Sequence, residues 1–386
     1  MKTKLVLGLT LATLLLAPSW PEPPLRTGAY VQDVTRTSAK ICWVGDRGDG
    51  VALVVTARGG GGAPSVAWQE RGERTVALVT GLLPATEYEF VANEGERRHT
   101  DLSGTFKTPP ATSDARVRFA VLGDSGGLPL WVNLSRAPIV HALASVDALP
   151  AAGHVSTIGA MLADAKPEFW LHTGDVIYPR GEQRHYRPGF FLPFAEALRH
   201  APVYPVIGNH DWEWTDGRPL LANFELPDVG DEQFFTFAWG PVRVVGLNLN
   251  RSVGLDPGLA FLDRVLAAAD EPWRIVVEHF PPWSASDQRD RPDLIERLVP
   301  ALVAAKVDVL FCGHDHTYQR YRAEGPLHVV VTGGGGKSLY ELREHPRLVV
   351  AKSAYHLCTV DCGPKQFSLR AVGLDGSEID SFSIEK

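Results

Sequence analysis

Gly313-His314-Asp315-His316 is the stretch that decides the fold, and it follows the largely apolar run Val307–Phe311. A short apolar run that ends near a glycine is typical of a buried strand. Two histidines separated by one residue present two imidazoles from a single turn, and imidazole is a common metal ligand. The stretch therefore predicts a metal site at the end of a buried strand.

Four more motifs of this kind precede it, each after an apolar run. They are Gly123-Asp124-Ser125-Gly126, Gly174-Asp175-Val176-Ile177-Tyr178, Gly208-Asn209-His210-Asp211 and Val276-Val277-Glu278-His279. Taken singly, each has an ordinary explanation, because Gly-Asp after a strand is usually a turn and a lone histidine is usually a hydrogen-bonded residue. All five in one order supply enough oxygen and nitrogen ligands for two metal ions that share one carboxylate, a device for displacement at phosphorus.

Helix-like stretches alternate with the predicted strands. They are Ser156–Ala165, Leu259–Ala269 and Pro292–Ala305. Alternating strands and helices indicate an α/β domain, in which ligands gather beyond the carboxyl ends of the strands. The five motifs are therefore expected to converge on one site.

From Val117 to Lys386 this pattern closely resembles the purple acid phosphatases, within the calcineurin-like metallophosphoesterase family. Most of the wider family opens with Asp-x-His, but Gly126 stands at that histidine here. Tyr178, three residues after Asp175, matches the purple acid phosphatase arrangement instead. The resemblance implies an α/β/β/α sandwich over residues 115–386, and a tyrosinate is a hard oxygen donor that suits Fe(III).

The resemblance also implies a role for each site residue. Fe(III) would be held by Asp124, Tyr178 and His316, a divalent ion (Fe, Zn or Mn) by Asn209, His279 and His314, and both ions by the bridging, catalytic Asp175. His210 would be the second catalytic residue, which contacts phosphate and protonates the leaving group. A metal-bound hydroxide would then hydrolyse small phosphate monoesters.

Two other functions stay open at this point. A phosphodiesterase or nucleotide hydrolase would use the same metals, and a non-catalytic secreted binding protein would carry a vestigial site. The intact ligand set disfavours the non-catalytic binding protein. Several relatives have a second histidine nine residues after the ligand His279, where Gln288 stands here. A neutral amide binds a doubly charged phosphate less strongly than an imidazolium does, so a weaker preference for monoesters over diesters is expected.

The front of the chain predicts export. Lys2 and Lys4 precede the apolar run Leu5–Ala17, which is too short for a stable bilayer span. Residues 1–19 are therefore predicted to be a signal peptide of a secreted or periplasmic protein without a stable membrane anchor. The net charge of −7 disfavours nucleic acid as a partner. The oligomeric state is left open.

Residues 24–109 predict a small all-β unit. Ala39–Val44 and Val51–Ala57 have strand character, and Leu83–Phe90 alternates and offers Tyr88 as a tyrosine corner. The unit resembles the fibronectin type III-like domain that precedes the catalytic domain in many larger purple acid phosphatases. We expect it to be a structural spacer.

Three further segments carry expectations without a clear function. Residues 127–153 form a stretch longer than compact family members have, and it is either a rim of the pocket or an inert insertion. Gly333–Gly336 predicts a tight turn rather than a phosphate cradle, because a strand-like segment rather than a helix is expected after Ser338. Cys358 and Cys362 flank a predicted turn, and whether they form a disulfide is left open.

Overall fold

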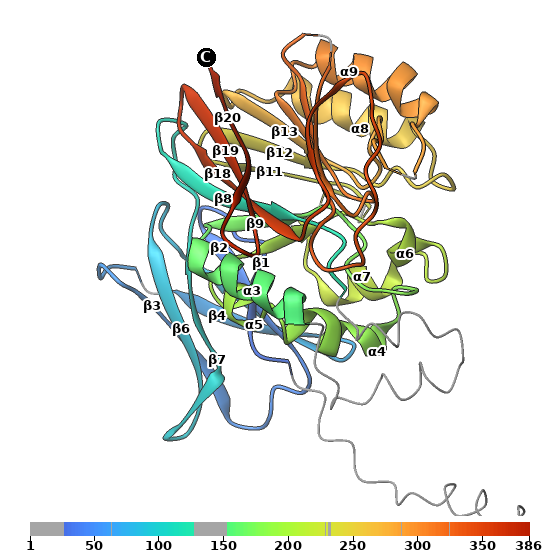
Figure 1. Cartoon of the computed structure of the whole chain (residues 1–386). Coiled ribbons are helices and arrows are strands. Elements are labelled where there is room, and N and C mark those ends of the chain that lie inside the picture. The colour runs from blue at the N-terminus through green and yellow to red at the C-terminus, as the bar shows by residue number, and fades with distance from the viewer. Residues whose placement is uncertain are drawn as a thin grey trace, which may run out of the picture.

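The computed structural model describes residues 27–62, 64–126, 153–227, 229–230, 233–286, 288–323 and 325–386. The predicted signal peptide and nearly all of the stretch 127–153 lie outside these residues. A β-rich unit (blue) comes first in the chain, and a larger α/β unit follows it (Figure 1). Within the described residues, no helix is long and apolar enough to cross a membrane.

The N-terminal unit is a sandwich of two antiparallel sheets, as predicted. The first sheet has the order β1 (Tyr30–Gln32), β2 (Ser38–Val44), β5 (Arg74–Thr80) and β4 (Ser65–Arg71). The second has the order β3 (Val51–Ala57), β6 (Glu87–Glu94) and β7 (Arg97–Lys107). The Tyr88 side chain is buried. Its hydroxyl accepts a hydrogen bond from the Leu83 amide at 2.8 Å, which is the contact expected of a tyrosine corner.

Both faces of β2 are buried, because each face has a different neighbour. Ile41 and Trp43 point into the core of the sandwich. Cys42 and Val44 belong instead to the apolar cluster that contains helices of the second unit. Alternation along a strand sends successive side chains to opposite faces, so this strand joins the two units.

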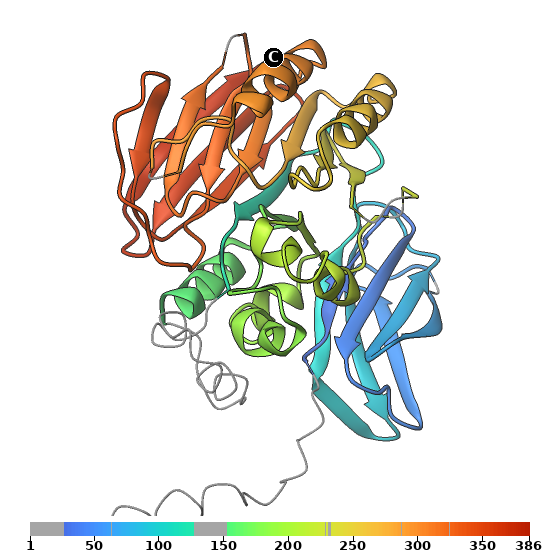
Figure 2. The same ribbon diagram turned by 90° about the vertical axis from the view of Figure 1, so that its right-hand side faces the viewer.

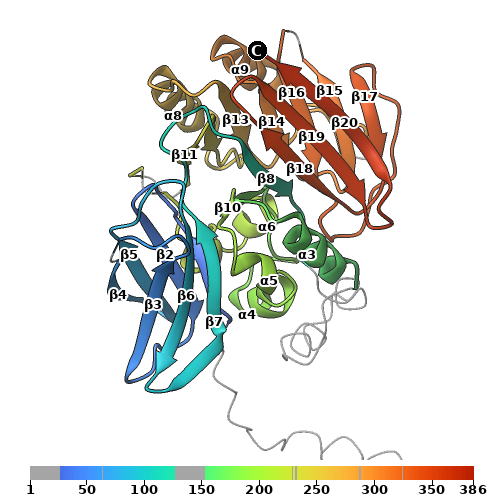
Figure 3. The ribbon, with the colours of Figure 1, turned by 90° about the vertical axis from the view of Figure 1, so that its left-hand side faces the viewer.

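Two stacked sheets form the centre of the second unit. Within the described residues, one sheet has the order β10 (Val203–Pro205), β9 (Phe169–His172), β8 (Val117–Leu122), β18 (His356–Cys362), β19 (Gln366–Gly373) and β20 (Glu378–Glu385). The other has the order β11 (Phe235–Trp239), β12 (Val242–Gly246), β13 (Trp273–Val277), β14 (Val309–Cys312), β16 (His328–Thr332), β15 (Tyr318–Arg322) and β17 (Leu348–Lys352). Figure 3 shows β8 and β18–β20 in front of β14–β16.

Side-chain alternation divides the unit into layers. Phe119 of β8 and Ile275 of β13 point into the space between the sheets. Ala120 points to the helices that cover the first sheet, whereas Val276 points to those that cover the second. The predicted α/β/β/α sandwich is confirmed, and Figure 2 shows the helices lying outside the paired sheets.

The helices follow the local sequence. The elements are α3 (Gly153–Ala165), α4 (Gln183–Tyr186), the π-helix η1 (Arg187–Phe191), α5 (Ala195–Leu198), α6 (Asn209–Trp212), α7 (Arg218–Asn223), α8 (Asp256–Ala267), the π-helix η2 (Leu294–Leu298) and α9 (Val299–Ala304). In α8, Pro257 occupies the first turn, where its missing amide hydrogen costs nothing, and Phe261 and Leu266 are buried. The predicted helix Pro292–Ala305 is present as the pair η2 and α9.

Two local predictions near the C-terminus are wrong. No turn separates Cys358 from Cys362, because both lie in β18, which pairs with β19 along its whole length and with β8 from Cys358 to Cys362. Four residues of extended strand span about 13 Å, well beyond the reach of a disulfide, and all four cysteines are free. The segment after Ser338 has no regular structure until β17 begins at Leu348.

Candidate metal centre

The five motifs lie at the ends of strands from both sheets. Asp124 follows β8, Asp175 follows β9 and Asn209 follows β10, and these three strands are parallel neighbours. His279 follows β13 and His314 follows β14, which are parallel neighbours in the second sheet. Parallel strands end at the same edge of a sheet, so the stacked sheets bring all five loops to one place.

The loops are held in strained conformations. Asp124, Asp175 and His314 have φ values of 59°, 54° and 67°, in the left-handed region that residues with a Cβ rarely adopt. Gly208 allows the close approach of the loops, because a Cβ there would lie 2.1 Å from Oδ1 of Asp175. Backbone strain of this kind clusters at functional sites, where the surrounding structure over-determines it.

The first group of donors surrounds the Tyr178 hydroxyl. This oxygen lies 3.0 Å from Asp124 Oδ1, 3.0 Å from Asp175 Oδ2 and 3.1 Å from His316 Nε2. Donor atoms bound to one ion at about 2.1 Å, with bonds at right angles, lie about 3 Å apart. The spacing and the buried oxygen and nitrogen donors therefore suit a hard metal ion.

The second group of donors surrounds the Asn209 side-chain oxygen. Oδ1 of Asn209 lies 3.1 Å from His279 Nε2 and 3.0 Å from His314 Nδ1. His279 Nε2 is also 3.5 Å from Asp175 Oδ1. The two carboxylate oxygens of Asp175 thus face different groups, Oδ2 toward Tyr178 and Oδ1 toward His279.

Hydrogen bonds orient the imidazoles within these groups. His279 Nδ1 donates to the Thr173 carbonyl at 2.8 Å, and His316 Nδ1 donates to the Ser338 carbonyl at 2.7 Å. Each bond turns the Nε2 of that ring toward the cluster, where it can bind a metal ion once it has lost its proton. Asp124, Asp175 and His279 place ligand atoms within 4.8 Å of one another, a candidate metal-binding cluster.

The charges of the buried groups depend on one another. Burial raises the pKa of the Tyr178 hydroxyl well above its ordinary value, and the neighbouring Asp124 and Asp175 raise it further. Burial opposes a charge on His279, but Asp175 outweighs it and raises the pKa of His279 to about 10. Two buried carboxylates beside a phenol form a site that favours a cation.

His210 lies beside the donors without joining them. Its amide donates to Asp175 Oδ1 at 2.8 Å, and its Nδ1 donates to the Pro179 carbonyl at 2.7 Å. Its ring centroid is 4.5 Å from that of Tyr178. The fixed Nδ1–H leaves Nε2 of His210 free to carry a transferable proton.

A cavity of about 650 Å³ opens beside the second group, and Asn209 and His314 line it together with Gln288. Gln288 thus lies near the site, as assumed from the sequence, while its neighbour Asp287 is outside the described residues. The effect of Gln288 on substrate preference stays a prediction.

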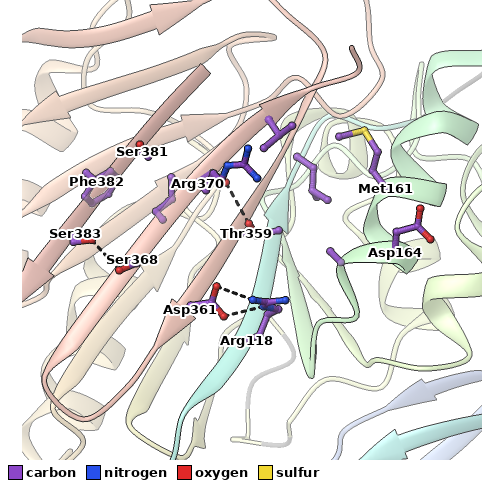
Figure 4. A pocket seen from close by; sticks show the side chains of 14 residues that line it. Arg118, Met161, Asp164, Thr359, Asp361, Ser368, Arg370, Ser381, Phe382 and Ser383 are labelled. Carbon is purple, nitrogen blue, oxygen red and sulfur yellow. Dashed lines mark hydrogen bonds and ion pairs between the residues drawn. The ribbon is translucent and has the colours of Figure 1, made fainter. Parts of the chain in front are cut away.

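Another cavity, of about 730 Å³, lies on the outer face of β18–β20 and holds the Arg118–Asp361 ion pair but none of the predicted site residues (Figure 4).

Three side chains near the donors were not predicted from the sequence. Tyr340 stacks on His316 with ring centroids 4.1 Å apart, and Lys337 lies over the Tyr178 ring. Trp214 lies beside His210. Trp214 comes four residues after His210, which was a usable signal, whereas Lys337 and Tyr340 arrive from a distant loop and no local pattern indicates their contacts.

Comparison with known proteins decides the family. A family model described as "Calcineurin-like phosphoesterase" matches residues 117–318. The chain belongs to this family. The calcineurin-like phosphoesterase region spans β8 to the start of β15 and includes every predicted ligand. The chain is therefore a metal-dependent phosphoric ester hydrolase.

The relatives and the solved structure with which the chain was compared are acid phosphatases. The chain is 27% identical over 308 residues to the tartrate-resistant acid phosphatase type 5 of Sus scrofa, covering 68% of this chain and 85% of that protein. It is 28% identical over 260 residues to purple acid phosphatase 4 of Arabidopsis thaliana, covering 58% of this chain and 70% of that protein. A solved purple acid phosphatase, PPD1 from yellow lupin seeds, matches the fold with a TM-score of 0.74 at 17% identity, over 94% of this chain and 75% of that one.

Proposed function

We propose that this phosphoesterase is an acid phosphatase of the purple acid phosphatase type, with two metal ions, and that it hydrolyses small phosphate monoesters. The observation that carries the proposal is the position of Asp175, whose two oxygens face two different sets of donors. The similarity to tartrate-resistant and purple acid phosphatases supports the same activity. We also propose that residues 1–19 are a signal peptide that directs export, and that the N-terminal sandwich is a fibronectin type III-like domain.

The donor types support a proposed metal for each group. Asp124, Tyr178 and His316 would hold Fe(III), because the phenol oxygen and the carboxylate are hard donors. Asn209, His279 and His314 would hold a divalent ion, for which Fe, Zn and Mn are all acceptable, and Asp175 would bridge. Bound there, the metals would supply Lewis-acid activation of water and neutralise charge on the phosphoryl oxygens.

The protein's own groups supply orientation and a proton. The hydrogen bonds that His279 and His316 donate to the carbonyls of Thr173 and Ser338 fix the two rings, so little reorganisation accompanies the reaction. His210, held through Nδ1 by the Pro179 carbonyl, offers the proton on Nε2 to the leaving oxygen. General acid catalysis of this kind typically contributes about 10²–10⁴-fold.

A panel of phosphomonoesters, phosphodiesters and nucleotides, run on metal-analysed protein, tests the proposal. Wild type should hydrolyse monoesters in acid and contain iron, with a visible tyrosinate-to-iron band that Tyr178→Phe abolishes.

Two further variants test the roles of the bridging carboxylate and of the proton donor. Asp175→Ala should lose metal and activity together. His210→Ala should keep both metals and lose about 10²–10⁴-fold in kcat, most severely on alkyl phosphates, while the exposed His200→Ala serves as control. Activity that persists without metal, or that is confined to diesters, would contradict the proposal.

A further inference from the structure

The segment Lys337–Arg343, called the strap below, lies between β16 and β17 and has no regular structure of its own. It is held by the loops that follow β8, β13 and β14. The first amide of the strap donates to the Asp124 carbonyl at 2.9 Å, and its last amide donates to the Ala285 carbonyl at 2.8 Å. Between them, the Tyr340 amide donates to the His316 carbonyl at 3.3 Å. The strap is therefore tied to three of the loops that bring the predicted ligands together.

Two contacts from the strap hold the ring of His316. Its Nδ1 donates to the Ser338 carbonyl at 2.7 Å, and the Tyr340 ring stacks on the imidazole with centroids 4.1 Å apart and planes inclined by 23°. The terminal torsion of a histidine side chain has a broad range, so a single hydrogen bond leaves the ring able to tilt. The stacked phenol covers one face and limits that tilt, while Nε2 faces the Tyr178 hydroxyl at 3.1 Å.

The histidines of the second donor group are held in another way. The His279 ring meets the rings of Phe280 and His314 with planes inclined by 75° and 76°. These are edge contacts, made by residues of the motifs themselves. The stacked contact from the strap acts on the first donor group, so its loss should affect one of the two proposed metals more than the other.

The ring and the hydroxyl of Tyr340 have different partners. The ring lies on His316, whereas the hydroxyl has a hydrogen bond with the Gln288 side chain. A phenylalanine at this position would keep the first contact and remove the second. The two parts of the tyrosine can therefore be tested separately.

We propose that Tyr340 is a positioning residue for the first donor group: its ring, rather than its hydroxyl, holds His316 in the orientation in which Nε2 can bind a metal ion. This role rests on the proposed function, in which the first group binds Fe(III). Residues that orient a metal ligand affect the affinity of the site without touching the ion. An aromatic contact of this kind typically contributes a factor of about 2 to 12.

Competition for the metals tests the proposal on protein loaded with Fe(III) and Zn(II). Tyr340→Ala removes the ring, Tyr340→Phe removes only the hydroxyl, and Ser338→Ala keeps the carbonyl that accepts from His316. Phe382→Ala is a matched control, because the Phe382 ring stacks on His328, outside the five motifs, with centroids 4.9 Å apart and planes inclined by 10°. Elemental analysis measures the iron and the zinc that each protein retains against increasing citrate, and absorption measures the visible tyrosinate-to-iron band.

The expected result is a selective loss of iron. Tyr340→Ala should hold iron about 2- to 12-fold less tightly than wild type, keep zinc within about twofold, and lose the band in proportion to the iron. The other three variants should match wild type. Equal loss of iron in Tyr340→Phe would mean that the hydroxyl acts, equal weakening of both metals would mean that the fold has loosened, and unchanged iron in Tyr340→Ala would mean that the ring has no effect.

Each of those three results overturns the positioning role and leaves the phosphatase intact. A wild type that binds neither metal overturns the proposed function, and the positioning role with it.

Hydrogen exchange gives a second readout that needs no release of iron. If the strap stabilises the metal site, bound metal must stabilise the strap by the same factor. Loading metal-free wild type with Fe(III) and Zn(II) should therefore slow amide exchange in residues 337–343, followed by mass spectrometry, and the slowing should be smaller by about 2- to 12-fold in Tyr340→Ala. A strap that exchanges at the same rate with and without metals would overturn the proposal.

Discussion

Lys337 places a positive charge over the phenol ring of Tyr178. Its ammonium nitrogen is 4.6 Å from the ring centroid, and no carboxylate among the described residues pairs with it. The bond from its own amide to the Asp124 carbonyl, at 2.9 Å, ties the lysine to the first motif. A cation over an aromatic face stabilises electron density in the ring, so Lys337 should stabilise a tyrosinate at this position.

Replacing Lys337 should therefore change the proposed iron–tyrosine band. Without the charge, electrons on the Tyr178 oxygen lie higher in energy, and Lys337→Met should move the band to longer wavelength while both metals remain. Visible absorption and metal analysis of the oxidised protein measure this, with the exposed Lys352→Met as control. A band at the wild-type position in Lys337→Met would show that the charge does not act on the ring.

His356 makes the fold sensitive to acid. It is fully buried, and burial lowers its pKa from 6.5 to about 4. Its Nδ1 donates to the Ala354 carbonyl at 2.9 Å, and its Nε2 lies 3.0 Å from the Thr332 hydroxyl. The folded pKa is below the unfolded value, so the unfolded chain binds the extra proton first and acid favours unfolding.

This linkage predicts a pH-dependent loss of stability. Its full contribution is present above pH 6.5 and is lost as the pH falls toward 4, at about 1.4 kcal/mol per unit and about 3 kcal/mol in total. His356→Gln, whose amide can make similar hydrogen bonds, should flatten the dependence of the free energy of unfolding on pH, measured in urea. The exposed His200→Gln should leave it unchanged. Parallel curves for wild type and His356→Gln would show that another group titrates.

At the scale of elements, three strands of the N-terminal unit converge on one carboxylate of the second unit. Glu225, just after α7, is 3% exposed. It accepts hydrogen bonds from Lys40 of β2 at 2.8 Å, from Arg71 of β4 at 3.2 Å and from the buried Arg74 of β5. Its main-chain amide donates to Gln32 of β1 at 3.2 Å.

Breaking this cluster should be costly. Glu225→Ala leaves the buried Arg74 without its counter-charge, and removal of one partner of a buried ion pair typically costs about 3–5 kcal/mol. The exposed pair Arg118–Asp361 is the control, because Asp361→Ala should cost about 0–1 kcal/mol. Chemical denaturation of both variants measures the difference. Similar losses would mean that burial adds nothing to the Glu225 cluster.

At the scale of the whole molecule, the two units share their hydrophobic cores. One cluster runs from Ile41 and Phe106 of the sandwich to Val117 and Trp239 of the second unit. Another joins Tyr30 to Phe191, whose ring centroids are 5.0 Å apart. A spacer that merely preceded the catalytic unit would keep a core of its own, so we expect this sandwich to be an integral part of the fold.

Unfolding should accordingly occur in one step. Scanning calorimetry of residues 27–386 should give a single transition, with the calorimetric enthalpy equal to the van't Hoff enthalpy. Residues 110–386 alone would expose the apolar surface around Phe191 and should aggregate. Two separated transitions, or a soluble and active 110–386 fragment, would show that the units are independent.

The sequence by itself determined the types and the order of the candidate ligands. Each motif is a local signal, an apolar run that ends at a polar ligand and, in four of the five motifs, at a glycine, and neither part depends on distant residues. The tyrosine corner at Tyr88 was equally local, since its partner Leu83 is five residues away. The α/β/β/α architecture came from the resemblance that these motifs carry.

Only the tertiary structure decided how the motifs meet. Three of the loops come from one sheet and two from the other, and the stacking of those sheets lets Asp175 face two donor groups at once. Lys337 reaches Tyr178 from a loop more than 150 residues away in the chain. The predicted turn between Cys358 and Cys362 was wrong for the same reason: pairing with β8 and β19 extends the segment, and strand pairing depends on distant partners that local sequence does not encode.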